Sequence, residues 1–172
     1  MSTINGNVCV VDGVAVDKVF SNGKQVYGRN LLAGTKAVET GIIKAGSRGI
    51  GGTHNLVSIV GGETYTYSIS MINMGHMGHS SISWFDANRN VLPGQAGNNH
   101  PWAANGGRFS NTFTAPSNAV YAVLIPWYLS RVWDSDTNIS WYQEKLEVGD
   151  IPTQLTPAPE DVMQFRKENT NE

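Results

Sequence analysis

Two stretches of the chain combine aromatic side chains with planar hydrogen-bonding groups, and these residues are best suited to holding a ligand. Residues 93–108 contain Trp102 together with His100 and Asn99. Residues 126–134 contain three aromatic rings and a guanidinium group, namely Trp127, Tyr128, Trp133 and Arg131. Aromatic rings present an apolar face, while amide, imidazole and guanidinium groups form hydrogen bonds. A sugar ring needs both kinds of contact, so the sequence predicts a saccharide-binding surface formed by the two stretches.

The histidines of residues 73–80 allow two interpretations. On a helix, His76 and His79 would share one face and could hold a metal ion, but the glycines beside them disfavour a helix. Two ligands also do not complete a zinc site. We therefore expect this segment to form the rim of the saccharide surface, with His76 contacting the ligand. Arg108, at the end of the first stretch, is a further candidate for ligand binding.

The carboxylates of the chain do not predict catalysis. A glycosidase needs two carboxylates facing each other across a cleft, about 5 to 9 Å apart. Apart from Asp86, no carboxylate that lies in a predicted strand beside a tryptophan suggests a clear second partner. A Gly-x-Ser-x-Gly nucleophile motif is absent from the chain. We therefore expect that the protein is not an enzyme.

Two other motifs suggest cofactors only on first inspection. Residues 46–51 resemble a dinucleotide phosphate loop, but no helical periodicity and no suitably spaced acidic residue follow them. Residues 134–138 match the first half of a calcium loop, whereas Ile139 and Lys145 stand where that loop needs Gly and Glu. We expect no cofactor; a structural calcium ion held between loops is left as a minor alternative.

Composition narrows the choice of partners. The 172 residues include 12 Lys and Arg against 14 Asp and Glu, which gives a net charge of -2. Nucleic acids and anionic membranes usually select a basic excess, so we expect neither as a partner. No apolar run approaches the length of a membrane-spanning helix. The single cysteine, Cys9, cannot form an internal disulfide, and the first residues lack the features of a signal peptide.

Hydrophobic periodicity predicts an all-β protein. Residues 64–72 place Tyr65, Tyr67, Ile69 and Met71 on one face and small hydroxyl residues on the other, which is typical of a half-buried antiparallel strand. Further strands are predicted at 80–86, 109–114, 119–129 and 139–147, with Trp84 and Trp141 in the core. No segment keeps a 3.6-residue period. Many short strands separated by turns predict a two-sheet antiparallel β-sandwich of the jelly-roll type.

The domain organisation follows from turns and composition. Asp12-Gly13 and Asn22-Gly23 are hairpin signals, so residues 1–29 are predicted to form a small N-terminal β-hairpin unit. Residues 30–153 form the predicted jelly roll. Residues 154–172 are rich in proline and then charged, and they are predicted to be a linker with a short helix at 162–167.

Two terminal stretches resemble a known family. Residues 10–32, VVDGVAVDKVFSNGKQVYGRNLL, and residues 141–161, which begin WYQEKLEVG, are similar to the opening and closing segments of modules in phages of lactobacilli and related Gram-positive bacteria. The family is the carbohydrate-binding-module-like jelly rolls of phage distal tail and other baseplate proteins. The resemblance implies a non-catalytic module on the virion, at the tail tip or baseplate, that binds host cell-wall polysaccharide for host recognition and viral adhesion. Its other partner would be the remainder of the tail protein. A structural or protein-docking domain of the baseplate, without sugar binding, is the alternative.

Overall fold

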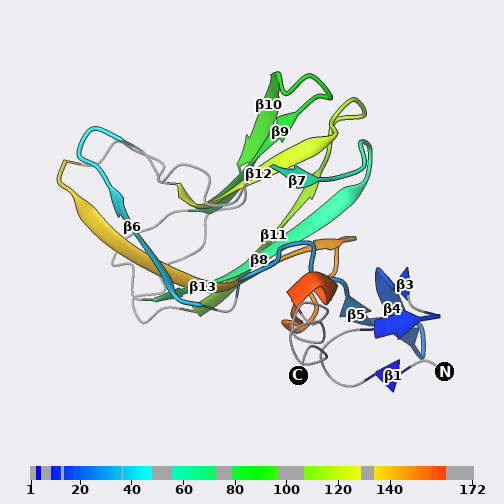
Figure 1. Cartoon of the computed structure of the whole chain (residues 1–172). Coiled ribbons are helices and arrows are strands. Elements are labelled where there is room, and N and C mark those ends of the chain that lie inside the picture. The colour runs from blue at the N-terminus through cyan, green and yellow to red at the C-terminus, as the bar shows by residue number, and fades with distance from the viewer. Residues whose placement is uncertain are drawn as a thin grey trace, which may run out of the picture.

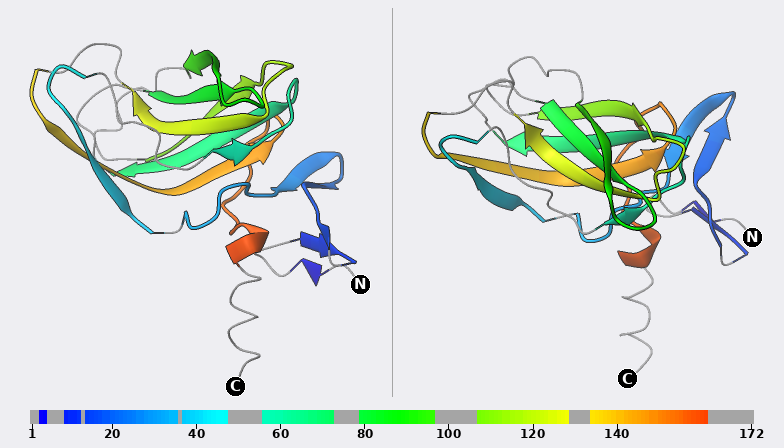
Figure 2. Two further views of the ribbon diagram at one scale, coloured as in Figure 1. Left: turned by 45° about the horizontal axis from the view of Figure 1, so that its top comes forward. Right: turned by 90° about the horizontal axis from the view of Figure 1, so that it is seen from above.

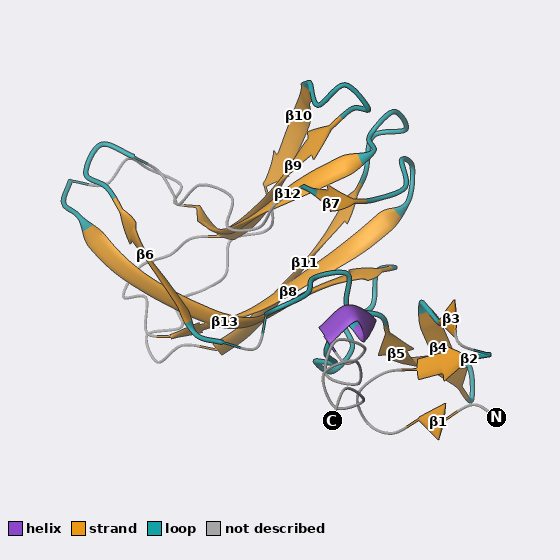
Figure 3. Ribbon diagram, in the orientation of Figure 1, coloured by secondary structure: helices purple, strands orange, loops and turns teal. Residues whose placement is uncertain are grey.

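The computed structural model describes residues 3–4, 9–12, 14–35, 37–47, 56–72, 79–96, 107–128 and 134–161. Strands dominate the fold, and the helical residues that the structure describes are a single turn at 159–161 (Figure 3). Within these ranges no helix is long and apolar enough to cross a bilayer. The dominance of strands confirms the prediction of an all-β protein.

Two four-stranded antiparallel sheets face each other (Figures 1 and 2). The β9 sheet has the order β10-β9-β12-β7, and the β13 sheet has the order β11-β8-β13-β6. Their strands are β6 (Glu39–Ile43), β7 (Val57–Ser58), β8 (Thr64–Ile72), β9 (His79–Phe85), β10 (Val91–Ala96), β11 (Gly107–Thr114), β12 (Tyr121–Tyr128) and β13 (Thr137–Val148). This arrangement is the predicted β-sandwich.

The N-terminal residues form two smaller sheets beside the sandwich (Figure 1). One sheet contains β1 (Thr3–Ile4), β2 (Cys9–Val11) and β3 (Val14–Ala15), and the other is the hairpin of β4 (Lys18–Ser21) and β5 (Lys24–Gly28). Both residues of the predicted turn between β4 and β5 have positive φ, 49° at Asn22 and 75° at Gly23. Consecutive positive φ angles are typical of the type I′ hairpin turn that Asn-Gly favours.

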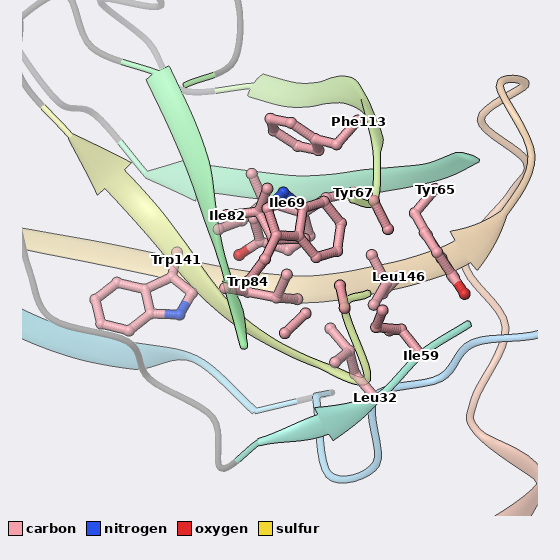
Figure 4. Packing of buried hydrophobic residues seen from close by; sticks show 14 of the residues in the cluster. Leu32, Ile59, Tyr65, Tyr67, Ile69, Ile82, Trp84, Phe113, Trp141 and Leu146 are labelled. Atoms are coloured by element: carbon pink, nitrogen blue, oxygen red, sulfur yellow. The ribbon is translucent and has the colours of Figure 1, made fainter. Parts of the chain in front are cut away.

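The core lies between the two large sheets (Figure 4). Trp84 and Trp141 are 0% and 2% exposed, which confirms their predicted place in the core. Tyr65 packs beside Trp84, with 6.4 Å between ring centroids. Asn111 crosses the core to donate a hydrogen bond from Nδ2 to the Ser80 hydroxyl over 2.7 Å. The alternating pattern of β8 supplies one wall of this core.

The outer face of β8 differs from the prediction of a half-buried strand. Thr66 and Ser68 point away from the core, yet both are fully buried. The reason is that residues 149–156 cross this side of the β13 sheet, where the Thr66 hydroxyl donates to the Gly149 carbonyl oxygen over 2.7 Å. Alternation along β8 specifies its two faces but not what the rest of the chain places over them.

The predicted loop at 93–108 is wrong at both ends. β10 continues to Ala96, and β11 already begins at Gly107. The register between β10 and β9 shifts after Leu92, which leaves Pro93 and Gly94 in an irregular stretch of an edge strand. Edge strands and bulges tolerate proline, so these two residues did not end the strand. Residues 97–106 lie outside the described residues.

The segment that leads into the sandwich, residues 28–34, contacts the segment that follows its last strand, residues 156–161. The Arg29 guanidinium binds the Glu160 carboxylate at 2.6 Å, and Gly34 donates its backbone N–H to Asp161 at 2.9 Å. The Thr156 hydroxyl donates to the Gly28 carbonyl oxygen over 3.3 Å. Residues 156–159 are buried, so this part of the chain packs on the module. The boundaries of the three predicted domains stay predictions.

Replacing Trp141 with alanine tests the core. The substitution removes a large buried side chain, so we expect the free energy of unfolding to fall by about 3–5 kcal/mol. Chemical denaturation followed by fluorescence or circular dichroism measures this loss. Val91→Ala is the matched control, because Val91 is 72% exposed, and it should cost about 1 kcal/mol or less. Equal losses in the two variants would contradict the core assignment.

Candidate functional site

The strand order brings several strand ends to one end of the sandwich, here called the loop end. Pairing of Gly107 with Met71 puts the start of β11 beside the end of β8. Pairing of Ala96 with Ser81, and of Tyr128 with His79, puts the ends of β10 and β12 beside the start of β9. The segments that connect these strands are 73–78, 97–106 and 129–136. All three predicted stretches are therefore joined to the sheets at the same end.

Most of the predicted ligand-binding residues cannot be placed individually. His76, Asn99, His100, Trp102, Arg131 and Trp133 lie outside the described residues. Trp127 and Tyr128 are the last two residues of β12. The register between β12 and β9 shifts between Ile125 and Tyr128. The assignment of these residues to a saccharide site stays a prediction.

Arg108 is the predicted site residue that the structure describes fully. It lies on the outer face of the β13 sheet, where its Nη1 donates to the Gln143 carbonyl oxygen at 2.9 Å and to the Ser70 hydroxyl at 3.3 Å. Desolvation lowers the pKa of the Arg108 guanidinium, while Glu147 and Tyr142 oppose this shift. Arginine keeps its charge at neutral pH. Arg108 therefore offers a fixed positive charge beside the loop end.

A β-bulge in β13 creates the environment of Arg108. Gln143 and Glu144 together face one residue of β8, because Tyr142 pairs with Ser70 and Lys145 with Ser68. Gln143 has a φ of 55°, which is uncommon for a residue with a Cβ atom. Its backbone N–H donates to the Thr35 carbonyl oxygen over 3.0 Å. The bulge lets Gln143 face outward while Glu144 turns into the core.

The Glu144 carboxylate is held inside the sandwich by two aromatic donors. Glu144 is 1% exposed and accepts hydrogen bonds from the Tyr67 hydroxyl and, over 3.1 Å, from Trp141 Nε1. Burial raises the pKa of the Tyr67 hydroxyl well above its ordinary value, and the negative charge of Glu144 raises it further. The carboxylate thus serves as a structural acceptor that fixes two core rings.

Asn30 joins the bulge to the start of the jelly roll, and sequence analysis did not single it out. It is fully buried, and its Nδ2 donates to the Glu144 carbonyl oxygen at 3.2 Å and to the Thr35 hydroxyl at 3.3 Å. Its Oδ1 accepts from the backbone N–H of Leu32 and of Leu146. An asparagine before two leucines carries little local signal, because two of its four partners lie more than 110 residues away in sequence.

A buried ion pair holds residues 149–156, here called the closing segment, on the outer face of the β13 sheet. Lys145 and Glu147 are both fully buried, with 3.3 Å between Nζ and Oε2. Lys145 also donates to Thr153 Oγ1 at 2.6 Å and to the Gln154 carbonyl oxygen at 2.7 Å. Burial lowers the pKa of Lys145, an effect that Glu147 partly offsets. Gly28 is required nearby, because a Cβ atom there would meet Glu147 Oε2 at 1.8 Å.

Asp136, in the segment that resembles half of a calcium loop, is already paired with the Lys44 ammonium group. Both oxygens of the Asp136 carboxylate are engaged, one by Lys44 Nζ at 2.7 Å and the other by the Ala45 N–H at 2.9 Å. The side-chain hydrogen bond from Lys44 is the main cause of the lowered pKa of Asp136. Across the part of the chain that the structure describes, no three His, Cys, Asp or Glu side chains cluster as metal ligands.

A hollow of about 400 Å³ lies apart from the predicted site. Its lining residues are Leu31, Leu32, Ala33, Leu56, Val57, Ser58 and Glu160. The Glu160 carboxylate is bound to Arg29 at 2.6 Å. None of the predicted ligand-binding residues lines this hollow.

No protein-family model and no curated protein matches the chain. Solved structures that are similar over part of it include the endo-1,4-β-D-xylanase 10B of Clostridium thermocellum, as CBM22-1 and GH10 modules complexed with xylohexaose. That similarity has 16% identity, a TM-score of 0.42, and covers 64% of this chain and 25% of that one. Another is the enzymatically active domain of tailspike protein 4 of bacteriophage CBA120, at 11% identity and a TM-score of 0.45. It covers 70% of this chain and 21% of that one. The chain thus spans a quarter or less of either protein, and similarity at this level assigns no function.

The buried Tyr67 hydroxyl predicts loss of stability in alkaline solution. Its pKa is raised in the folded state, whereas in the unfolded chain it ionises near pH 10. Above that pH the unfolded state binds fewer protons than the folded state, so the free energy of unfolding falls as pH rises. Denaturant titrations at a series of pH values measure this slope. Tyr67→Phe should flatten it, and an unchanged slope would contradict the assignment to Tyr67.

Proposed function

We propose that the protein is a non-catalytic saccharide-binding module of a phage tail or baseplate protein, and that it binds host cell-wall polysaccharide during adsorption. The observation that carries the proposal is the meeting of strand ends at the loop end. Three segments of the sequence rich in aromatic, amide and imidazole groups are joined to the sheets there. A sugar requires apolar faces and hydrogen-bonding groups together.

Three of the described carboxylates are engaged by neighbouring groups of the fold, which supports the proposal of a binding role. Glu144 is held by Tyr67 and Trp141, and Glu147 by Lys145 and Thr153. Asp86 accepts hydrogen bonds from its own turn, including two from Asn90. Each of these groups serves the fold. Acid–base hydrolysis would instead need a pair of carboxylates facing a shared opening.

Placement on a virion rests on the resemblance of the terminal segments to phage tail modules. A docking domain without sugar binding is the second candidate, and one specific observation favours it. The N-terminal strands expose four large hydrophobic side chains, at 43% to 69% of their surface, namely Val11, Val14, Phe20 and Val26. Exposed apolar groups gathered in one region often mark protein contacts. Both roles fit one chain if this region contacts the tail and the loop end contacts the host.

Fluorescent labelling of bacterial cells distinguishes saccharide binding from protein docking. A fluorescent fusion of residues 1–172 should label the surface of intact cells from at least one strain in a panel of lactobacilli, and purified cell-wall polysaccharide should compete. A fusion that leaves every strain dark, while remaining folded, would favour the docking function.

Trp102→Ala should abolish this labelling. The proposal gives the ring a direct contact with the sugar, and we expect the melting temperature to stay within a few degrees because the residue is predicted to lie outside the core. Phe20→Ala is the matched control, since it removes an exposed aromatic ring from the N-terminal hairpin, and it should label cells like the parent. Normal labelling by Trp102→Ala would remove residues 97–106 from the site.

Salt dependence tests the charge of the ligand. The net charge is -2, so binding to a neutral polysaccharide should change less than about twofold between about 50 and about 300 mM salt. Titration of the whole chain with purified polysaccharide at both concentrations measures this. A loss of about tenfold or more would instead indicate an anionic polymer such as teichoic acid.

A further inference from the structure

The outer face of the β13 sheet is divided into a covered half and an open half. At the covered half, Lys145 and Glu147 are fully buried beneath residues 149–156 and beside Gly28. Toward the loop end this cover stops. The open half, here called the open face, consists of the outward-facing side chains of 38–42, 70–72 and 138–143 together with Arg108. In Figure 1 the closing segment lies under one end of this sheet, and β6 lies toward the other end.

Strand register places the open face in rows. Arg108 pairs with Ser70, and Ser70 pairs with Tyr142. The next row joins Ile72 to Ser140 on β13 and to Thr40 on β6. A third row pairs Asn138 with Ile42. Rows that share a face are about 7 Å apart along a strand, so the open face is long enough for a short oligosaccharide.

Apolar and polar side chains alternate across these rows. Ile72 is 43% exposed and stands beside the Ser140 hydroxyl. Ile42 is 48% exposed and stands beside the Asn138 amide. The core of a protein–protein interface gathers apolar groups into one desolvated patch. On the open face, each aliphatic group has a polar neighbour. This arrangement suits a saccharide, because a sugar ring carries an apolar C–H face and polar hydroxyl groups.

The charges of the open face also favour a neutral ligand. Lys44 and Asp136 neutralise each other at its edge, with 2.7 Å between Nζ and Oδ2. Arg108 adds one positive charge. Its Nη1 is bound to Ser70 and Gln143, and within the described residues no hydrogen bond is made by Nε or Nη2. One guanidinium suits hydroxyl and ring oxygens, whereas binding of a polyanion usually involves several basic groups.

We propose that the open face is a second saccharide subsite, which continues the loop-end surface across the β13 sheet, with Tyr142 contacting a sugar ring and Arg108 donating to its hydroxyls. This inference rests on the proposed function at the loop end. The open face reaches the loop end, because Ile72 is the last residue of β8 and Arg108 is the second residue of β11. A long polysaccharide would occupy both, and a ligand too short to span them would occupy one.

Affinity measurements on variants of the whole chain test this subsite. The probe is purified cell-wall polysaccharide from a strain of lactobacillus that the fluorescent fusion decorates. Tyr142→Ala should weaken binding about tenfold, through loss of the ring contact. Ile42→Arg should weaken it at least threefold, because it adds bulk and charge to the open face without removing a hydrogen bond. Thr112→Ala, an exposed position on the covered half of the same sheet, is the matched control and should bind like the parent.

The outcomes separate this inference from the proposed function. If Tyr142→Ala and Ile42→Arg keep parental affinity while Trp102→Ala loses it, the open-face subsite is wrong and the loop-end site stands. If the parent chain decorates no strain and binds none of the polysaccharides extracted from the panel, both proposals are wrong. Arg108→Lys provides a further check, because it keeps the charge but removes the planar donors. It should weaken binding, and parental affinity would contradict the role of Arg108.

Discussion

The bulge at Gln143 and Glu144 is the constraint on which the rest of the structure depends. A left-handed backbone at a residue other than glycine costs about 1–3 kcal/mol, and several contacts oppose that cost here. The Thr35 carbonyl oxygen accepts the Gln143 N–H, and Arg108 donates to the Gln143 carbonyl oxygen. The same extra residue turns Glu144 toward Tyr67 and Trp141. One irregularity thus organises both the core and the outer face of the β13 sheet.

The bulge also divides the outer face of the β13 sheet into a covered half and an open half. Beyond it, Lys145 and Glu147 bind Gln154 and Thr153, so residues 149–156 cover this half of the sheet. Before it, Tyr142 is half-buried, and Ile72 and Ile42 are exposed. A module that is anchored on one side and open on the other is suited to presenting a ligand-binding surface. The buried polar groups fix the position of residues 149–156 on the sheet, because leaving any of these groups without its hydrogen-bond partner would cost free energy.

Local sequence patterns predicted those parts of the fold that depend on neighbouring residues. Alternation along 64–72 predicted β8 and its core side chains, and Asn22-Gly23 predicted a hairpin, because both signals act over a few residues. The roles of Asn30 and Gln143 depend on partners far along the chain, so no local pattern indicated them. Pro93 and Gly94 were interpreted as breakers, since the sequence does not reveal that β10 is an edge strand. Arg108 was predicted to bind ligand because of its residue type. Its hydrogen bonds to Ser70 and Gln143 depend on how the strands pair, which the sequence does not reveal.

The central claim is that saccharide binds at the loop end and along the adjoining sheet face. The most direct measurement is a titration of isotope-labelled protein with purified cell-wall polysaccharide, followed by backbone amide chemical shifts. The account predicts shifts concentrated at Ile72, His79, Gly107 and Tyr128 and along the open face, with little change in the N-terminal strands. Shifts confined to residues 9–28, or none at saturating polysaccharide, would contradict it.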